Sequence, residues 1–245
     1  MNICFITTYI GPKNLLDISD NFPKNNNYDY LCFTNLNKNE INNKSWEIIQ
    51  INLQDFNSTK NNVKISRYFK FYAIDYLVKI NRKYDYIFYC DSYLYPNVDI
   101  NWQTICNQIK NSNFKIIQYL HPSKNMSINT DFGKIIANKK ETIDNIEKTK
   151  LFLKNIDLNI DLNTKQYYEN TVLGYDPNDK DVINFMKEFW NYYQECSTYR
   201  DQPLWNFLYL KNKKKPCLDK LFRENFLGTK KIERRLKEYQ TSNLV

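Results

Sequence analysis

Short apolar runs that alternate with polar segments constrain the fold of this chain more than any other sequence feature. Runs rich in β-branched and aromatic residues, each bounded by Asn, Lys, Asp or Pro, lie at residues 3–8, 28–33, 46–51, 84–90 and 114–120. Such runs are typical of buried strands. Apolar residues spaced three and four apart over 65–80 predict a helix between the third and fourth runs, with Ser58 or Ser66 near its start. This alternation predicts an α/β fold, with a mainly parallel sheet and helices on both faces.

The second half of the chain predicts more helices than strands. The charged stretch 141–156 and the residues 182–193 have helical periodicity, and a last apolar helix follows Pro203. Residues 168–173 predict one further strand. Because the sequence has no internal repeat and no glycine-serine linker, we expect a single domain over residues 1–245.

Composition narrows the class of protein. Glycine occurs only 4 times, so asparagine is expected to form the tight turns. The net charge of +8 suits an anionic partner such as nucleic acid, a membrane surface or a diphosphate substrate, although part of it lies at 211–215 and 230–237, where it can be solvated surface. The 6 cysteines form no Cys-x-x-Cys pair, and we expect free, buried thiols. The first apolar run is too short for a signal peptide and no stretch could span a membrane, which predicts a soluble, cytoplasmic protein.

Asp91 is the strongest candidate functional residue, and Ser92 and Tyr93 follow it. It ends an apolar run that we expect to be a central parallel strand. Ligands bind at this carboxyl edge in open α/β sheets. A carboxylate there can hold a divalent cation, Mn²⁺ or Mg²⁺, which offsets the charge of a diphosphate. The structural alternative is an aspartate that caps a turn.

Other polar residues are weaker candidates by themselves. Arg67 and Lys70 are neighbours on the predicted helix and could hold phosphates, or they could be solvated side chains. His121, the single histidine, follows the 114–120 run and could bind a metal or a phosphate, or be structural. Asp201 could cap the last helix, with Pro203 in its first turn. Alternatively, Asp201 or Glu169 is a general base that Arg200 orients.

The order of these pieces resembles a known family. A basic helix, an aspartate that ends a strand, His121-Pro122, a glutamate, a Phe- and Trp-rich helix and then Arg-Asp-Gln at 200–202 follow one another along the chain. This resembles the glycosyltransferase-like domain of plant mucilage-type and bacterial sugar-transfer proteins, over roughly residues 1–209. Phe-Thr-Asn at 33–35 is similar to that family's Phe-Thr-Asp. Two features depart from the pattern: Tyr93 stands where many GT-A enzymes have a second metal carboxylate, and no acidic cluster follows Pro122.

The resemblance implies a GT-A fold, a nucleotide-sugar donor, with a UDP-sugar favoured, and a hydroxyl acceptor. It implies a nucleotide-binding half at 1–120, a sugar and acceptor half at 121–210 and a basic tail at 211–245. The residues expected to bind the donor are Thr7, Thr8, Tyr9, Arg67, Lys70, Asp91, Ser92, Tyr93, His121 and Gln202, and the catalytic candidates are Asp201, Glu169 and Arg200. An inactive relative that binds sugar nucleotides and a basic nucleic-acid-binding protein are the alternatives, but the aromatic residues follow core spacing, so we expect no stable nucleic-acid complex.

Overall fold

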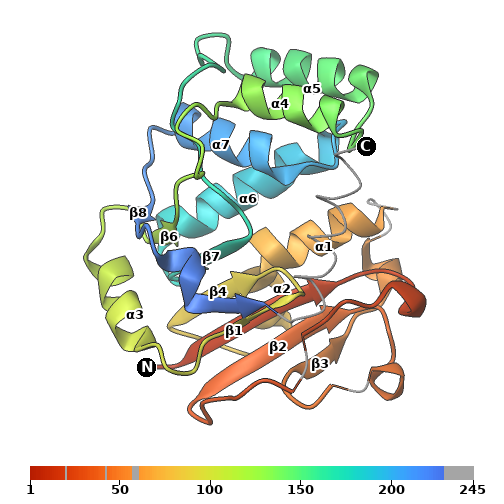
Figure 1. The fold of residues 1–245 in the computed structure, drawn as a ribbon, viewed down its shortest axis with the longest axis vertical. Helices are drawn as coiled ribbons and strands as arrows, with labels where there is room; N and C mark the ends of the chain where they lie inside the picture. Colours follow the sequence, from red (N-terminus) through yellow and green to blue (C-terminus); the bar gives the residue numbers. More distant parts are fainter. Residues whose placement is uncertain (20, 42, 57–60, 229–245) are drawn as a thin grey trace, which may run out of the picture.

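The computed structural model describes residues 1–19, 21–41, 43–56 and 61–228, and Figure 1 shows a central sheet with helices packed on it. Within these residues one seven-stranded sheet has the order β3-β2-β1-β4-β7-β6-β8. Its strands are β1 Ile3–Tyr9, β2 Tyr28–Thr34, β3 Glu47–Gln50, β4 Tyr86–Cys90, β6 Ile116–Gln118, β7 Val172–Tyr175 and β8 Cys217–Leu218. In this sheet β7 alone runs antiparallel to both of its neighbours. A separate two-stranded ribbon joins β5 Leu94–Pro96 to β9 Phe226–Gly228.

Helices cover both faces of the sheet, as the alternation of runs predicts. The helices are α1 Asn62–Phe71, α2 Ala73–Lys79, α3 Trp102–Asn111, α4 Ile128–Ala137, α5 Ile143–Ile156, α6 Lys180–Glu195 and α7 Asp201–Lys211. Short 3-10 turns lie at η1 Lys13–Leu15, η2 Lys38–Glu40, η3 Leu53–Phe56 and η4 Phe222–Asn225. Side chains alternate along β1, so Cys4 and Ile6 join the core beneath α1, α6 and α7, whereas Ile3 and Phe5 join the core beneath α3. The mainly parallel sheet with helices on both faces confirms the predicted α/β fold class.

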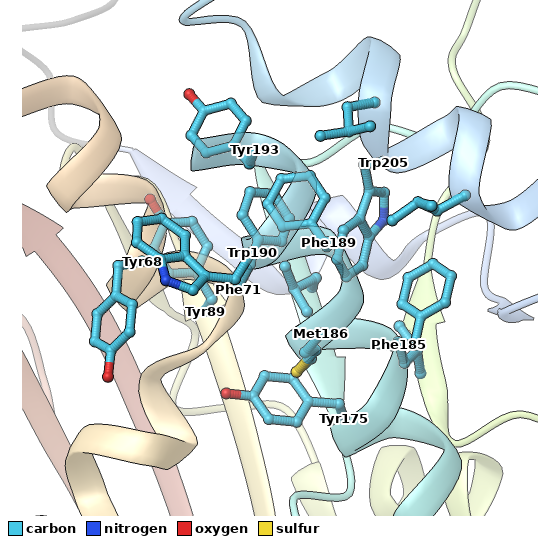
Figure 2. Close-up of a cluster of buried hydrophobic side chains, with 14 of the residues drawn as sticks. Tyr68, Phe71, Tyr89, Tyr175, Phe185, Met186, Phe189, Trp190, Tyr193 and Trp205 are labelled. Carbon is cyan, nitrogen blue, oxygen red and sulfur yellow. The ribbon is translucent and has the colours of Figure 1, made fainter. Parts of the chain in front are cut away.

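Aromatic rings hold three helices of the larger core together, and Figure 2 shows them. Phe71 of α1 lies 4.4 Å from Phe189 of α6 and 4.5 Å from Trp205 of α7, measured between ring centroids. Phe71, Phe189 and Trp205 are each fully buried. Truncating a ring in such a core typically costs about 3–5 kcal/mol. This packing fixes α1 and α7, the two helices that carry charged residues to the candidate site.

The helix predicted over 65–80 is two helices. The backbone leaves the helical region at Tyr72, with φ −135° and ψ 27°, and α2 starts afresh at Ala73. Both helices bury the same face, so the apolar periodicity continues across the break and conceals it. The cap is Asn61, whose side chain accepts hydrogen bonds from the amides of Val63 and Lys64. Ser66 therefore does not cap the helix, and Ser58 lies outside the described residues.

The strand predicted at 168–173 is shifted toward the C-terminus. Regular pairing occurs at Val172–Tyr175, while Tyr168 forms an isolated bridge with Leu120. More residues separate Tyr168 from Gly174 than separate Leu120 from Ile117, so the chain bulges between the two pairings. The bulge contains Glu169 and Asn170, and it places them beside the site described below.

Turn chemistry and thiols largely follow the predictions. Asn21 and Asn81 have positive φ, as do Lys139 and Lys213, whereas no glycine does. Asparagine thus takes over part of the usual role of glycine. All six cysteines are free, five of them buried and Cys217 half-buried. In the part of the chain that the structure describes, no helix is both long enough and apolar enough to cross a membrane.

Candidate functional site

The carboxyl ends of β1 and β4 meet at the point where the strand order reverses. The two strands pair in parallel, with Ile6 opposite Tyr89. From β1 the sheet continues through β2 and β3 on one side, and from β4 through β7 on the other. Open α/β sheets bind ligands at such a point. Two predicted donor-binding groups lie at this edge: Thr7, Thr8 and Tyr9 end β1, and Asp91, Ser92 and Tyr93 follow β4.

Two of these residues have unsatisfied hydroxyls. The Oγ1 atoms of Thr7 and Thr8 are buried and have no hydrogen-bond partner. Buried polar groups rarely lack a partner, and the unmade bond costs free energy. The loop that follows is well held, because the Tyr9 hydroxyl donates to the carbonyl of Pro12 at 2.6 Å and the Gly11 amide donates to Asn35 Oδ1 at 2.8 Å. The end of β1 therefore offers two buried hydroxyls that a ligand could satisfy, whereas the third such group, the Tyr175 hydroxyl, lies in the core.

Asp91 is held by its neighbours on both sides. Its amide donates to the Thr171 carbonyl at 3.0 Å. Its Oδ1 accepts from the Tyr89 hydroxyl at 2.9 Å and from Lys70 Nζ at 3.4 Å. Lys70 is almost fully buried and reaches Asp91 from α1. The carboxylate thus stands at the sheet edge with one oxygen already bonded twice.

The residues around Asp91 do not supply the ligand set that holds a resident divalent cation. Residue 93 is a tyrosine. Burial and Asp91 raise the pKa of its hydroxyl, so the hydroxyl stays protonated at neutral pH. No group of three or more His, Cys, Asp or Glu side chains is arranged to hold a metal among the described residues. One carboxylate with a single uncommitted oxygen is a poor cage for an ion that takes six or more oxygen ligands.

Asp201 lies at the centre of a buried charge network. Its Oδ1 accepts from Arg67 Nε at 2.8 Å, and its Oδ2 lies 3.5 Å from Lys70 Nζ and 3.0 Å from Asn170 Nδ2. Burial would raise the pKa of Asp201, but Lys70, Arg67 and Arg200 outweigh burial and lower it well below its usual range. Lys70 also contacts Asp91, so it joins the two carboxylates.

The prediction that Asp201 caps α7 is wrong. The helix begins at Asp201 itself, and Arg200 occupies the cap position without a side-chain cap bond. The carboxylate faces α1 instead, because Arg67 and Lys70 offer it stronger, charged donors than backbone amides. Pro203 does lie in the first turn, as expected.

A buried amide extends this network into the sheet. Gln118 Nε2 donates to Asn170 Oδ1 at 3.0 Å and to the Glu169 carbonyl at 2.9 Å, and its Oε1 accepts from Trp205 Nε1 at 3.0 Å. Gln118 therefore fixes the bulge that carries Glu169 and Asn170. Sequence reasoning missed both amides, although a glutamine at the end of an apolar run is itself a signal of a polar network.

Four predicted site residues line one pocket of about 230 Å³ next to this network: His121, Glu169, Arg200 and Gln202. His121 Nε2 lies 3.1 Å from Glu169 Oε1. The Ser123 amide donates to His121 Nδ1 at 3.0 Å, so Nε2 carries the ring hydrogen and donates it to Glu169. Burial and Lys134 lower the pKa of His121, which keeps the imidazole neutral at pH 7.

A second acid shares this pocket. Asp131 of α4 accepts from the Tyr167 hydroxyl at 2.5 Å, and burial raises its pKa. Burial and the nearby Asp131 also raise the pKa of Glu169. Sequence reasoning missed Asp131 because it did not predict α4, although Ile128, Phe132 and Ile135 have helical spacing. A carboxylate with a raised pKa, oriented by a neutral imidazole, is suited to accept a proton.

Comparisons with known proteins add little about these residues. No family model and no curated protein matches the chain. Among solved structures it is similar to core-mannan synthase A from Aspergillus fumigatus, in a form with manganese and GDP, at 12% identity and a TM-score of 0.44, over 86% of this chain and 70% of that one. At this identity and TM-score the likeness transfers no residue role.

Proposed function

We propose that this chain is a glycosyltransferase, which moves a sugar from a nucleotide-sugar donor to a hydroxyl group of a glycan, a protein or a small molecule. The observation that carries the proposal is the link between the two parts of the site. Lys70 contacts Asp91 at the carboxyl edge and Asp201 in the buried network, and Gln202, the next residue, lines the pocket of Glu169. A ligand-binding edge thus adjoins a pocket that contains a base.

The donor half of the proposed site is the edge at β1 and β4. Tyr9 would stack on the base, and the unpaired hydroxyl of Thr7 or Thr8 would bond the ribose. Asp91, with Ser92 and Tyr93, would lie near the diphosphate. We favour UDP-sugars among the donors. Arg67 and Lys70 would lie beneath the donor and act on it through their charge. Both are ion-paired to Asp201, and Lys70 is almost fully buried.

Glu169 is the base that the geometry favours. Asp201 is buried, its pKa is lowered, and both of its oxygens already have cationic partners. Glu169 instead faces a pocket, and its pKa is raised. In the reaction Glu169 takes the proton of the acceptor hydroxyl while the acceptor oxygen bonds to the anomeric carbon. The bond from that carbon to the diphosphate oxygen breaks, and its electron pair leaves with the nucleoside diphosphate. Direct attack of this kind inverts the anomeric configuration.

A ligand screen tests this proposal. The melting temperature and slow donor hydrolysis are measured with UDP-, GDP-, CMP- and dTDP-sugars for the wild type, Asp91→Asn and Asp99→Asn. Asp99 is exposed beyond β5 and is the matched control. A donor that binds the folded state must raise the melting temperature by mass action. We expect one nucleotide class to stabilise the wild type and Asp99→Asn, and hydrolysis to be lost in Asp91→Asn.

Other outcomes favour the alternatives. Stabilisation of the wild type without any turnover, with acceptors supplied, would identify an inactive relative that binds sugar nucleotides. If no sugar nucleotide shifts the melting temperature at millimolar concentration, the chain is not a glycosyltransferase. Salt-sensitive binding to RNA or DNA is then the next measurement.

A further inference from the structure

A C-terminal segment crosses the carboxyl edge of the sheet beside Asp91. We call residues 217–228 the strap. It begins as β8, which pairs with β6, and the Asp219 amide donates to the Gln118 carbonyl at 3.3 Å. It ends as β9, which pairs with β5 just after Asp91, with Gly228 opposite Leu94. Figure 1 shows the strap in blue. It therefore joins the pocket side of the site to the donor side.

The middle of the strap is anchored by two buried rings. Phe222 packs 6.3 Å from Phe88 of β4, and Phe226 packs 5.2 Å from Trp102 of α3, measured between ring centroids. The two rings also contact each other, at 5.6 Å. Arg223 lies between them in η4, so its backbone has a fixed place above the sheet edge.

Arg223 is a cation without an acidic partner. It is half-buried, and its Nη1 donates to the Phe226 carbonyl at 2.8 Å. No carboxylate of the described residues lies within ion-pair distance of it, whereas Arg67 and Lys70 are both paired. A guanidinium offers five N–H donors, and one such bond leaves most of them free.

Its charge acts on two phenols, those of Tyr93 and Tyr119. Burial and Asp91 raise the pKa of Tyr93, and Arg223 opposes that rise. Burial and Glu169 raise the pKa of Tyr119 to about 12, again against Arg223. The geometry agrees, because η4 and its Arg223 directly precede β9, and β9 pairs with β5, which begins one residue after Tyr93.

A charge balance shows what the site still needs. Lys70 and Arg67 are already ion-paired with Asp91 and Asp201, so neither is a free cation for a diphosphate. A nucleotide-sugar brings a diphosphate, and further charge collects on its leaving oxygen as the bond to the sugar breaks. Arginine binds phosphate through two parallel N–H bonds and keeps its charge at any working pH.

We propose that Arg223 binds the diphosphate of the donor, and that donor binding therefore needs no divalent cation. This inference rests on the proposed function. Arg223 donates hydrogen bonds to the phosphate oxygens and stabilises the charge of the departing nucleoside diphosphate, with no proton transferred. The strap thus supplies from the C-terminal end of the fold what a second carboxylate and its metal ion would supply after β4.

Binding of UDP and GDP, by titration calorimetry in EDTA and again with Mn²⁺, tests this inference. The proteins are the wild type, Arg223→Gln, Arg223→Lys and Lys220→Gln, which removes an exposed charge from the same strap. We expect the wild type to bind one nucleotide in EDTA and Arg223→Gln to bind it about 10- to 100-fold more weakly, since hydrogen bonds to charged groups are lost. Arg223→Lys should lie between them, and Lys220→Gln within about twofold of the wild type.

The outcomes separate this inference from the proposed function. Binding that appears only with Mn²⁺, or an Arg223→Gln affinity equal to that of the wild type, overturns the role of Arg223 and leaves the glycosyltransferase proposal standing. Absence of UDP and GDP binding under all conditions overturns the role of Arg223, and the screen of sugar nucleotides then decides the proposed function separately. The melting temperature of each ligand-free variant shows whether it folds, and Arg223→Lys serves if Arg223→Gln does not.

Discussion

Asp201 and Glu169 are both carboxylates of the same site, but their surroundings give them opposite properties. Asp201 is buried among Arg67, Lys70 and Asn170, and its pKa is lowered. Glu169 faces a pocket that holds a second acid, Asp131, and its pKa is raised. The first carboxylate is kept ionised as part of the framework, whereas the second can exchange a proton. Environment therefore assigns the roles of two residues that the sequence leaves equivalent.

The largest effect is expected at the pocket. Glu169→Gln keeps the shape of the side chain but cannot accept a proton, so donor turnover should fall by about 10²- to 10⁴-fold. Binding of the nucleotide, followed by the melting temperature, should be unchanged. Glu195→Gln, an exposed change at the end of α6, is the control. Equal turnover in the two variants would remove Glu169 from the mechanism.

The corresponding amide substitution at Asp201, in the buried charge network, should lower stability rather than turnover. Asp201→Asn leaves Arg67 and Lys70 without their buried counter-charge, and we expect a loss of about 3–5 kcal/mol of unfolding free energy, measured in urea. A loss below about 1 kcal/mol would contradict the view that Asp201 belongs to the framework.

Lowering the pH should reduce the difference in unfolding free energy between the wild type and Asp201→Asn. The pKa of Asp201 is lower in the folded chain than its ordinary value of 3.8, so its stabilisation is complete above about pH 4. The stabilisation is lost as the pH falls from there through the folded-state pKa. We expect the free-energy gap between the wild type and Asp201→Asn to narrow in that range. A gap that stays constant as the pH is lowered would show that its origin is not the charge.

A smaller effect is expected at His121. Its Nε2–H bond stabilises the Glu169 carboxylate, so His121→Phe should raise the pKa of Glu169 further. Because the base acts when ionised, the acid limb of the pH–rate profile should move to higher pH, by about one unit. A profile with an unmoved acid limb would show that the imidazole does not orient the base.

The smallest effect is expected for an exposed ion pair, with which the effect at the buried ion pairs can be compared. Lys148 and Asp144 form an exposed pair four residues apart on α5. Lys148→Gln should cost no more than about 0.5 kcal/mol of unfolding free energy, since water already screens such pairs. A cost similar to that of Asp201→Asn would mean that burial does not separate the two classes of ion pair in this protein.

Much of the fold follows from local patterns. The apolar runs at 3–8, 28–33 and 84–90 become β1, β2 and β4 with small shifts at their ends, because a buried parallel strand needs a continuous apolar segment. The position of Asp91 at the carboxyl edge follows from the same pattern. The helices α3 and α4 were missed, although the apolar residues of each have the spacing of an amphipathic helix.

Long-range pairing accounts for most of what the sequence could not predict. Arg67 and Asp201 are 134 positions apart, and no local pattern shows that they form an ion pair. The sequence therefore left helix capping and a general-base role as the two alternatives for Asp201. Glu169 and His121 were both predicted as candidates, but their contact depends on a bulge that Gln118 holds from another strand. The order of residues gives the parts of the site, and only the folded chain gives their partners.

The strap also affects the order in which the site can be built. β5 pairs with β9, which lies near the opposite end of the described chain. A ribosome releases β1, β4 and Asp91 well before it releases Arg223, and closing so long a loop is slow compared with local pairing. The sheet can therefore assemble while its edge is still open. Arg223 is released after these strands, so a nascent chain could contain the folded framework before Arg223 reaches its place.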